Sequence, residues 1–104
     1  MRRMISTALV VTVLAVLPMA SADAGNPGKG QKIYDANCAS CHGSDGMALV
    51  PGTPHFRKNE RMEKPDGALL KTIRSGKNLM PAWRGTISET DMLDAIAYVR
   101  TLAR

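Results

Sequence analysis

The sequence predicts an all-α fold with three main helices joined by long loops. Apolar side chains recur at helical spacing at 29–37, at 67–75 and after Ser88, and no stretch alternates apolar and polar residues as a strand would. Phe, Trp and Tyr make up only 4% of the 104 residues. So small a chain with so few aromatic side chains is expected to complete its core with a bound group.

Composition sets the outer limits on function. The chain is 44% hydrophobic and 22% charged, with a formal net charge of +5. Its length allows one domain, which excludes multidomain enzymes and long repeat arrays. The positive net charge favours acidic partners. The mixture of both signs of charge and the expected export argue against nucleic acid as a partner.

Residues 1–22 have the organisation of a secretory signal peptide. Two arginines precede an uncharged stretch at 4–17, and small residues follow it. The small-x-small rule allows cleavage after Ala22, which we favour, or after Ala24. The apolar run is shorter than the roughly 18 residues of a spanning helix. We therefore expect residues 23–104 to form an exported, periplasmic domain with no membrane span.

The first predicted helix leads into the only two cysteines of the chain. Asn26 and Pro27 form a helix start, and the pattern continues over 29–37. C-A-S-C-H follows at 38–42, the attachment signature of a c-type haem. Its thiols add to the haem vinyl groups and its imidazole reaches the iron. We expect Cys38 and Cys41 to hold one haem c covalently, with His42 as the proximal iron ligand.

Other uses of these cysteines fit the sequence less well. A disulfide across two intervening residues would remove little entropy from the unfolded chain. A thioredoxin-like pair requires a preceding strand, where the sequence predicts a helix. A zinc site would combine Cys38, Cys41 and His55, but a closed structural site needs a fourth good ligand.

Met80 is the predicted distal ligand. Met47 follows His42 too closely to pass easily round a haem rim, Met62 lies in a polar segment, and Met92 belongs to a helical apolar pattern. Met80 precedes Pro81, which stiffens the turn that carries the thioether. A His/Met ligand pair raises the reduction potential and leaves no open coordination position on the iron.

Residues 43–65 are rich in Gly and Pro and show no sustained period, which predicts a long loop that serves a site. Asp66 is expected to cap a helix over 67–75 that Gly76 ends in the left-handed conformation. Ser88 and Asp91 form an S-x-x-D capping pattern for the last helix. The residues expected to face the core are Leu69, Leu70 and Ile73 in the second helix and Met92, Ala95, Ile96, Val99 and Leu102 in the last.

In this order, the motifs resemble those of small class I c-type cytochromes. The chain contains G-Q-K-I-Y-D-A-N before C-A-S-C-H-G, then R-S-G-K-N-L-M-P-A-W, then S-E-T-D-M-L-D-A-I-A-Y-V-R. The resemblance implies a helical fold wrapped around one covalent haem, in which the first and last helices cross at Gly30 with Tyr34 and Tyr98 beside them. It also implies that a proline carbonyl, from Pro51 or Pro54, accepts the Nδ1 proton of His42.

The expected function is outer-sphere transfer of one electron by a periplasmic carrier that is not an enzyme. With His42 and Met80 both bound, iron changes oxidation state without binding a substrate. Lys77 and Arg84 flank Met80 and would steer redox partners with acidic surfaces, while Trp83 either borders the haem or is an ordinary core residue. Two alternatives remain: a subunit of a larger exported dehydrogenase, and a haem sensor or catalyst with a labile distal ligand.

Overall fold

The computed structural model describes residues 4–15 and 25–104. Both predicted cleavage sites, after Ala22 and Ala24, lie outside these residues. Residues 4–15 contain no helix or strand. In the described part of the chain, no helix has the length and apolar character needed to cross a membrane.

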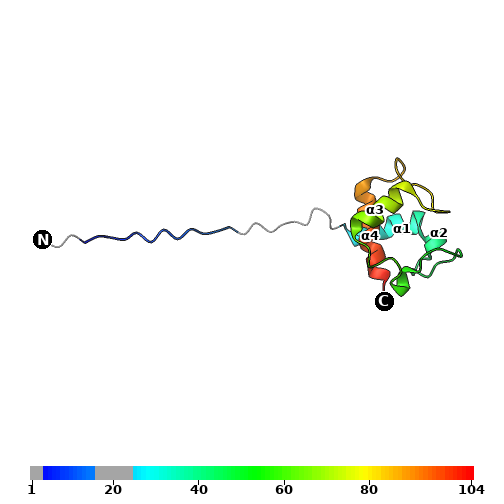
Figure 1. The fold of residues 1–104 in the computed structure, drawn as a ribbon, viewed down its shortest axis with the longest axis horizontal. Helices are drawn as coiled ribbons and strands as arrows, with labels where there is room; N and C mark the ends of the chain where they lie inside the picture. The colour runs from blue at the N-terminus through cyan, green and yellow to red at the C-terminus, as the bar shows by residue number, and fades with distance from the viewer. Residues whose placement is uncertain (1–3, 16–24) are drawn as a thin grey trace.

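The domain is helical, as predicted. Its elements are α1 (Pro27–Asn37), α2 (Ala39–His42), the 3₁₀ turn η1 (Phe56–Lys58), α3 (Asp66–Ser75) and α4 (Glu89–Leu102) (Figure 1). Residues 25–104 contain no strand beyond two isolated bridges, Lys77 with Met80 and Arg84 with Ile87. The three main helices are confirmed. The single helical turn α2 at the cysteine motif and the turn η1 inside the long loop are additions to the prediction.

Helix α1 begins where its capping residues predict and crosses α4 closely. The Asn26 side chain accepts a hydrogen bond from the Lys29 backbone N–H at 3.1 Å. The Asn26 backbone N–H in turn donates to the Asp94 carboxylate at 2.7 Å, which ties the start of α1 to α4. Gly30 is buried at the crossing, where a Cβ atom would overlap the backbone carbonyl of Asp94. Only glycine therefore permits this approach of the two helices.

The buried apolar core lies mainly along this crossing. Its members are Tyr34, Met92, Ala95, Ile96 and Val99. The Tyr34 ring meets Tyr98 edge-on with centroids 5.3 Å apart, and its hydroxyl donates to the Gly43 carbonyl at 2.6 Å. The arrangement of Gly30, Tyr34 and Tyr98 that the resemblance implies is therefore present.

Helix α3 departs from the prediction at both ends. Pro65 takes the N-cap position without a side-chain hydrogen bond, and Asp66 is the first helical residue. The Asp66 carboxylate accepts from Arg100 instead, so the predicted Asp66 cap is wrong. Gly76 ends the helix with the expected positive φ of 74°, but its ψ of 169° lies outside the left-handed helical region. Leu69, Leu70 and Ile73 are half-buried, and no residue of α3 is fully buried.

Candidate functional site

Both cysteines lie at one helical turn. Cys38 caps α2, and its carbonyl accepts hydrogen bonds from the backbone N–H groups of Cys41 and His42 at 3.2 and 3.0 Å. Both thiols are free in the structure. Burial, with a smaller contribution from Cys41, raises the pKa of Cys38 to about 11. The turn thus presents two thiols and an imidazole within five consecutive residues.

The His42 ring is buried and held on two sides. Its Nδ1 lies 3.4 Å from the carbonyl oxygen of Pro54, and the Phe56 ring stacks on it with centroids 4.4 Å apart and planes 14° from parallel. Burial lowers the pKa of His42, which favours the neutral imidazole, while the Pro54 carbonyl acts in the opposite direction. Within the described residues no hydrogen bond reaches Nε2. The ring therefore offers a neutral nitrogen for a metal.

The path of the long loop selects the proline beside His42. Of the two that the sequence left open, Pro54 supplies the carbonyl. The loop is fixed to α2 by the Leu49 N–H, which donates to the Cys41 carbonyl at 2.8 Å. His55 closes the loop on itself, since its Nδ1 accepts from the Ala48 N–H at 2.8 Å. Residues 4–15 and 25–104 contain no cluster of three or more metal-ligating His, Cys, Asp or Glu side chains, so Cys38, Cys41 and His55 do not form one in this structure.

Phe56 is a site residue that the sequence did not single out. It is the only phenylalanine of the chain, it lies in a loop rich in Gly and Pro, and it follows directly on Pro54 and His55. An isolated aromatic residue in such a loop was the available signal. Its ring contacts both His42 and the buried Tyr34, whose centroid lies 6.5 Å away. Phe56 therefore connects the motif to the core.

Met80 lies on a separate segment that is attached to α3. Met80 and Lys77 exchange two backbone hydrogen bonds of 2.9 and 3.1 Å, which closes a tight turn. The Trp83 N–H donates to the Ile73 carbonyl at 2.9 Å, so the segment returns to the helix it left. A Cβ atom at Gly76 would lie 2.7 Å from the Met80 carbonyl, which explains the glycine there. Met80 and Trp83 are both half-buried.

These residues fit a c-type haem. Two free thiols share one turn, a neutral imidazole keeps Nε2 available, and a half-buried thioether supplies a soft sulfur. The apolar side chains around the Met80 segment are also incompletely covered, as expected of a core that a bound group completes. They are Leu69, Leu70, Ile73, Trp83 and Ile87, all half-buried.

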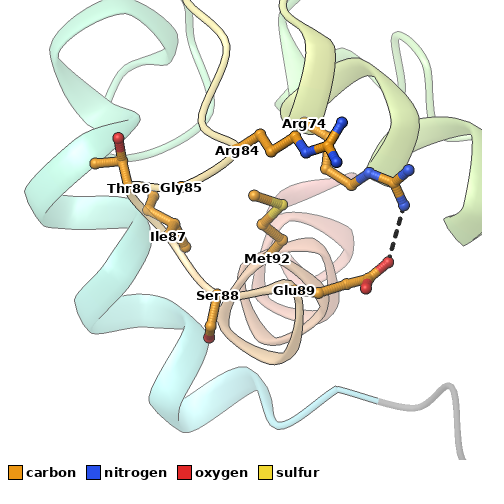
Figure 2. A pocket seen from close by; sticks show the side chains of 8 residues that line it. All are labelled: Arg74, Arg84, Gly85, Thr86, Ile87, Ser88, Glu89 and Met92. Atoms are coloured by element: carbon orange, nitrogen blue, oxygen red, sulfur yellow. Dashed lines mark hydrogen bonds and ion pairs between the residues drawn. The ribbon is translucent and has the colours of Figure 1, made fainter.

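A cavity of about 590 Å³ lies where α3 ends and α4 begins. Figure 2 shows the Met92 side chain extending into it from α4, with Ile87 on one side and the Arg74–Glu89 ion pair on the other. Its lining includes none of Cys38, Cys41, His42 or Met80. The cavity therefore lies at Arg74 and Arg84, where the segment that carries Met80 leaves α3 and returns to it, and not at the predicted haem-binding residues.

Comparison with known proteins identifies the family. Residues 25–99 match the family model described as cytochrome c oxidase, cbb3-type, subunit III. Cytochrome c6 of a Nostoc species is 37% identical over 79% of this chain and 73% of its own length. Cytochrome c6 of Euglena viridis is 34% identical over 71% of this chain and 90% of its own.

A longer relative and a solved structure agree with these matches. The cbb3-type oxidase subunit CcoP of an Azospirillum species is 31% identical over 79% of this chain, which spans 30% of that protein. The crystal structure of cytochrome c6 from the diatom Phaeodactylum tricornutum matches with a TM-score of 0.64 and 28% identity, covering 74% of this chain and 93% of the diatom chain. The chain belongs to the cytochrome c family, as a small class I c-type cytochrome that carries one covalently attached haem c and transfers electrons rather than catalysing a reaction.

Proposed function

We propose that the protein is a periplasmic one-electron carrier whose haem c is bound by Cys38 and Cys41 and ligated by His42 and Met80. When bound, the haem iron supplies the ferric and ferrous states between which one electron is gained and lost. The observation that carries the proposal is the His42 ring, whose Nδ1 faces the Pro54 carbonyl while no hydrogen bond within the described residues occupies Nε2. A ligating histidine is oriented in this way.

The residues around the two ligands have distinct tasks. Pro54 and Phe56 orient the His42 ring from two directions, which fixes where Nε2 points. The Lys77–Met80 turn and Gly76 hold the Met80 backbone beside α3. Cys38 and Cys41 would attach the cofactor through thioether bonds at the same turn as His42. A fixed ligand set changes little between oxidation states, as an outer-sphere carrier requires.

The charge around Met80 supports docking with acidic redox partners. Residues 67–88 contain Lys71, Arg74, Lys77 and Arg84 and no Asp or Glu. All four side chains belong to exposed residues, and Leu79, between two of them in sequence, is 87% exposed. An exposed apolar side chain flanked in sequence by Lys77 and Arg84 suits a transient partner whose approach is guided electrostatically. Such guidance weakens as salt rises.

Export through a signal peptide at 1–22 is part of the same proposal. Its support is the uncharged, apolar stretch between the arginines and the small residues. Expression of the full chain in a Gram-negative host that matures c-type cytochromes should yield haem protein in the periplasmic fraction. Its mass distinguishes cleavage after Ala22 from cleavage after Ala24, and retention of residues 1–22 would contradict the proposal.

The optical spectrum tests the ligand assignment. We expect the ferric protein to show the weak far-red band of a methionine sulfur bonded to ferric haem, and the ferrous protein to bind no CO at neutral pH. Met80→Ala should lose the band and bind CO. Met62→Ala is the matched control, because Met62 is also half-buried, and should behave as the wild type. A Met80→Ala variant that keeps the band would show that another residue is the distal ligand.

A permanent complex is the second candidate, favoured by the similarity to the oxidase subunit CcoP. In that case the chain would pass electrons as a subunit of a larger redox enzyme. Purification from its native source distinguishes the two: a monomer that binds partners weakly supports the carrier, and a stable complex supports the subunit.

A further inference from the structure

Helix α3 is joined to α4 by an ion pair at each end. Asp66, the first residue of α3, pairs with Arg100 near the end of α4, with N···O 2.6 Å. Arg74, near the end of α3, pairs with Glu89, the first residue of α4, at 3.0 Å (Figure 2). The two helices therefore run antiparallel with a polar contact at both ends. No residue of α3 is fully buried, so polar contacts add to its half-buried apolar packing in fixing its position.

The two ion pairs differ in strength. Arg100 donates from Nε and Nη2 to Asp66 Oδ1 at 2.8 and 2.6 Å, and it also donates to the carbonyl oxygens of Met62 and Lys64 at 3.1 and 2.8 Å. The Arg74 side chain makes one hydrogen bond, and its pair with Glu89 is more exposed than the pair of Arg100 with Asp66. A planar guanidinium can satisfy several acceptors at once, whereas a single exposed pair contributes little. The Arg100 cluster is thus the main polar attachment of α3.

The same helix carries the Met80 segment. The Trp83 N–H donates to the Ile73 carbonyl and the Arg84 N–H to the Arg74 carbonyl, at 2.9 and 3.3 Å. The segment that contains Met80 therefore leaves the end of α3 and returns to it. A displacement of α3 relative to α4 would move the Met80 thioether with it.

We propose that Arg100 is a positioning residue for Met80. By holding the start of α3 and the end of the preceding loop against α4, its guanidinium keeps α3, and with it the Met80 segment, where the thioether can stay bound. The inference rests on the proposed ligation by His42 and Met80. It predicts that loss of Arg100 weakens Met80 ligation more than it weakens the α1–α4 core, which Arg100 does not join.

The test compares the haem-loaded wild type with Arg100→Leu, Arg100→Lys and the control Arg57→Leu. Arg57 is an exposed arginine whose pair with Asp45, at 3.6 Å, lies outside α3 and α4. Two quantities are measured for each: the CO affinity of the ferrous protein, and the urea concentrations at which the far-red band and the helical circular dichroism are lost. CO binds only when the sulfur leaves, so its apparent affinity reports how easily Met80 is released.

In Arg100→Leu we expect the CO affinity to rise roughly tenfold or more, since hydrogen bonds to a charged group are each worth about that factor. The far-red band should disappear at a lower urea concentration than the helical signal. Arg100→Lys keeps the charge but loses the planar guanidinium that donates to several acceptors, so its CO affinity should lie between those of Arg100→Leu and the wild type. The CO affinity of Arg57→Leu should match that of the wild type. If Arg100→Leu fails to fold, Asp66→Asn replaces it, because that change breaks the ion pair and leaves the two carbonyl acceptors.

Two negative results have different meanings. In the first, both Arg100 variants and Asp66→Asn bind CO as the wild type does and lose the far-red band at the same urea concentration. This result would overturn the role of Arg100 while leaving His/Met ligation intact. A wild type that lacks the far-red band and binds CO freely would instead remove the proposed ligation, and the role of Arg100 with it.

Discussion

The α1–α4 crossing and the α3–Met80 region are built on different principles. At the crossing, Gly30 admits the backbone of α4, and Tyr34 and Ile96 are almost completely buried. Helix α3 buries no residue fully, Leu79 beside Met80 is 87% exposed, and ion pairs and backbone hydrogen bonds join this region to the rest of the domain. The crossing is filled by its own side chains, whereas the apolar side chains of the α3–Met80 region are at most half-buried, as expected beside the haem that the family carries.

This difference separates what stabilises the domain from what tunes its function. Close-packed side chains at the crossing resist change, because each lost or added methylene is felt as a cavity or as strain. A region held by polar contacts and a cofactor can shift with less cost, and it carries Met80, the proposed distal ligand, whose release would alter the iron. Substitutions in the two regions should therefore have different consequences.

The largest expected effect is at Gly30. In Gly30→Val the added side chain would overlap the Asp94 carbonyl, so α1 and α4 must separate. We expect a loss of about 4 kcal/mol or more in the free energy of unfolding, measured in urea by circular dichroism. Gly67→Ala is the control in the other region, because nothing lies within 4 Å of its Cβ position; it should be neutral or stabilising by about 0.5 kcal/mol. If Gly30→Val and Gly67→Ala were equally stable, the α1–α4 crossing would be no more closely packed than the α3 region.

Sequence patterns predicted the crossing better than the α3 region. Asn26 and Ser88 cap their helices as expected, with the Ser88 hydroxyl accepting from the Asp91 N–H at 3.1 Å, because capping is a local interaction. The Asp66 carboxylate, predicted to cap α3, instead accepts from Arg100, which lies 34 residues away. No local signal distinguishes these two uses of one carboxylate.

The candidate site shows the same division between local and distant information. Cys38, Cys41 and His42 lie within five consecutive residues, so the motif alone predicted that they serve one haem, although it did not predict the helical turn α2 that holds them. The choice of Pro54 over Pro51 and the stacking of Phe56 on His42 depend on the path of a loop. That path is fixed by contacts such as Ala48 with His55, which composition does not reveal.

A smaller effect is expected at Tyr34, which links the crossing to Gly43, directly after the turn that carries Cys38, Cys41 and His42. Tyr34→Phe removes the hydroxyl that donates to the buried Gly43 carbonyl and should cost about 1–2 kcal/mol in the free energy of unfolding. Tyr98→Phe is the control, because no hydrogen bond of the Tyr98 hydroxyl occurs within residues 25–104; its cost should be close to zero. A Tyr34→Phe variant as stable as the wild type would show that Gly43 finds another donor.

Tyr34 also predicts a dependence of stability on pH. Burial, with smaller contributions from nearby groups, raises its pKa above the ordinary value of 10.0. The unfolded chain therefore releases this proton at a lower pH than the folded one, so the contribution of Tyr34 is complete below pH 10 and declines as the pH rises further. Urea unfolding followed between pH 9 and 11 should show a steeper loss in the wild type than in Tyr34→Phe. Parallel profiles would exclude Tyr34 as the source.

The smallest effect is expected at Arg74, and it sharpens the contrast within the α3–Met80 region itself. Its pair with Glu89 is a single contact between exposed side chains, at 44% and 59% exposure, so water already solvates both charges. Arg74→Gln should therefore lower the free energy of unfolding by no more than about 0.5 kcal/mol and leave the far-red band unchanged. The equally exposed Arg57→Gln provides the matched comparison. Should Arg74→Gln weaken the band as much as Arg100→Leu, the end of α3 nearest Met80 would be its main anchor, because loss of one exposed pair could then release the segment on its own.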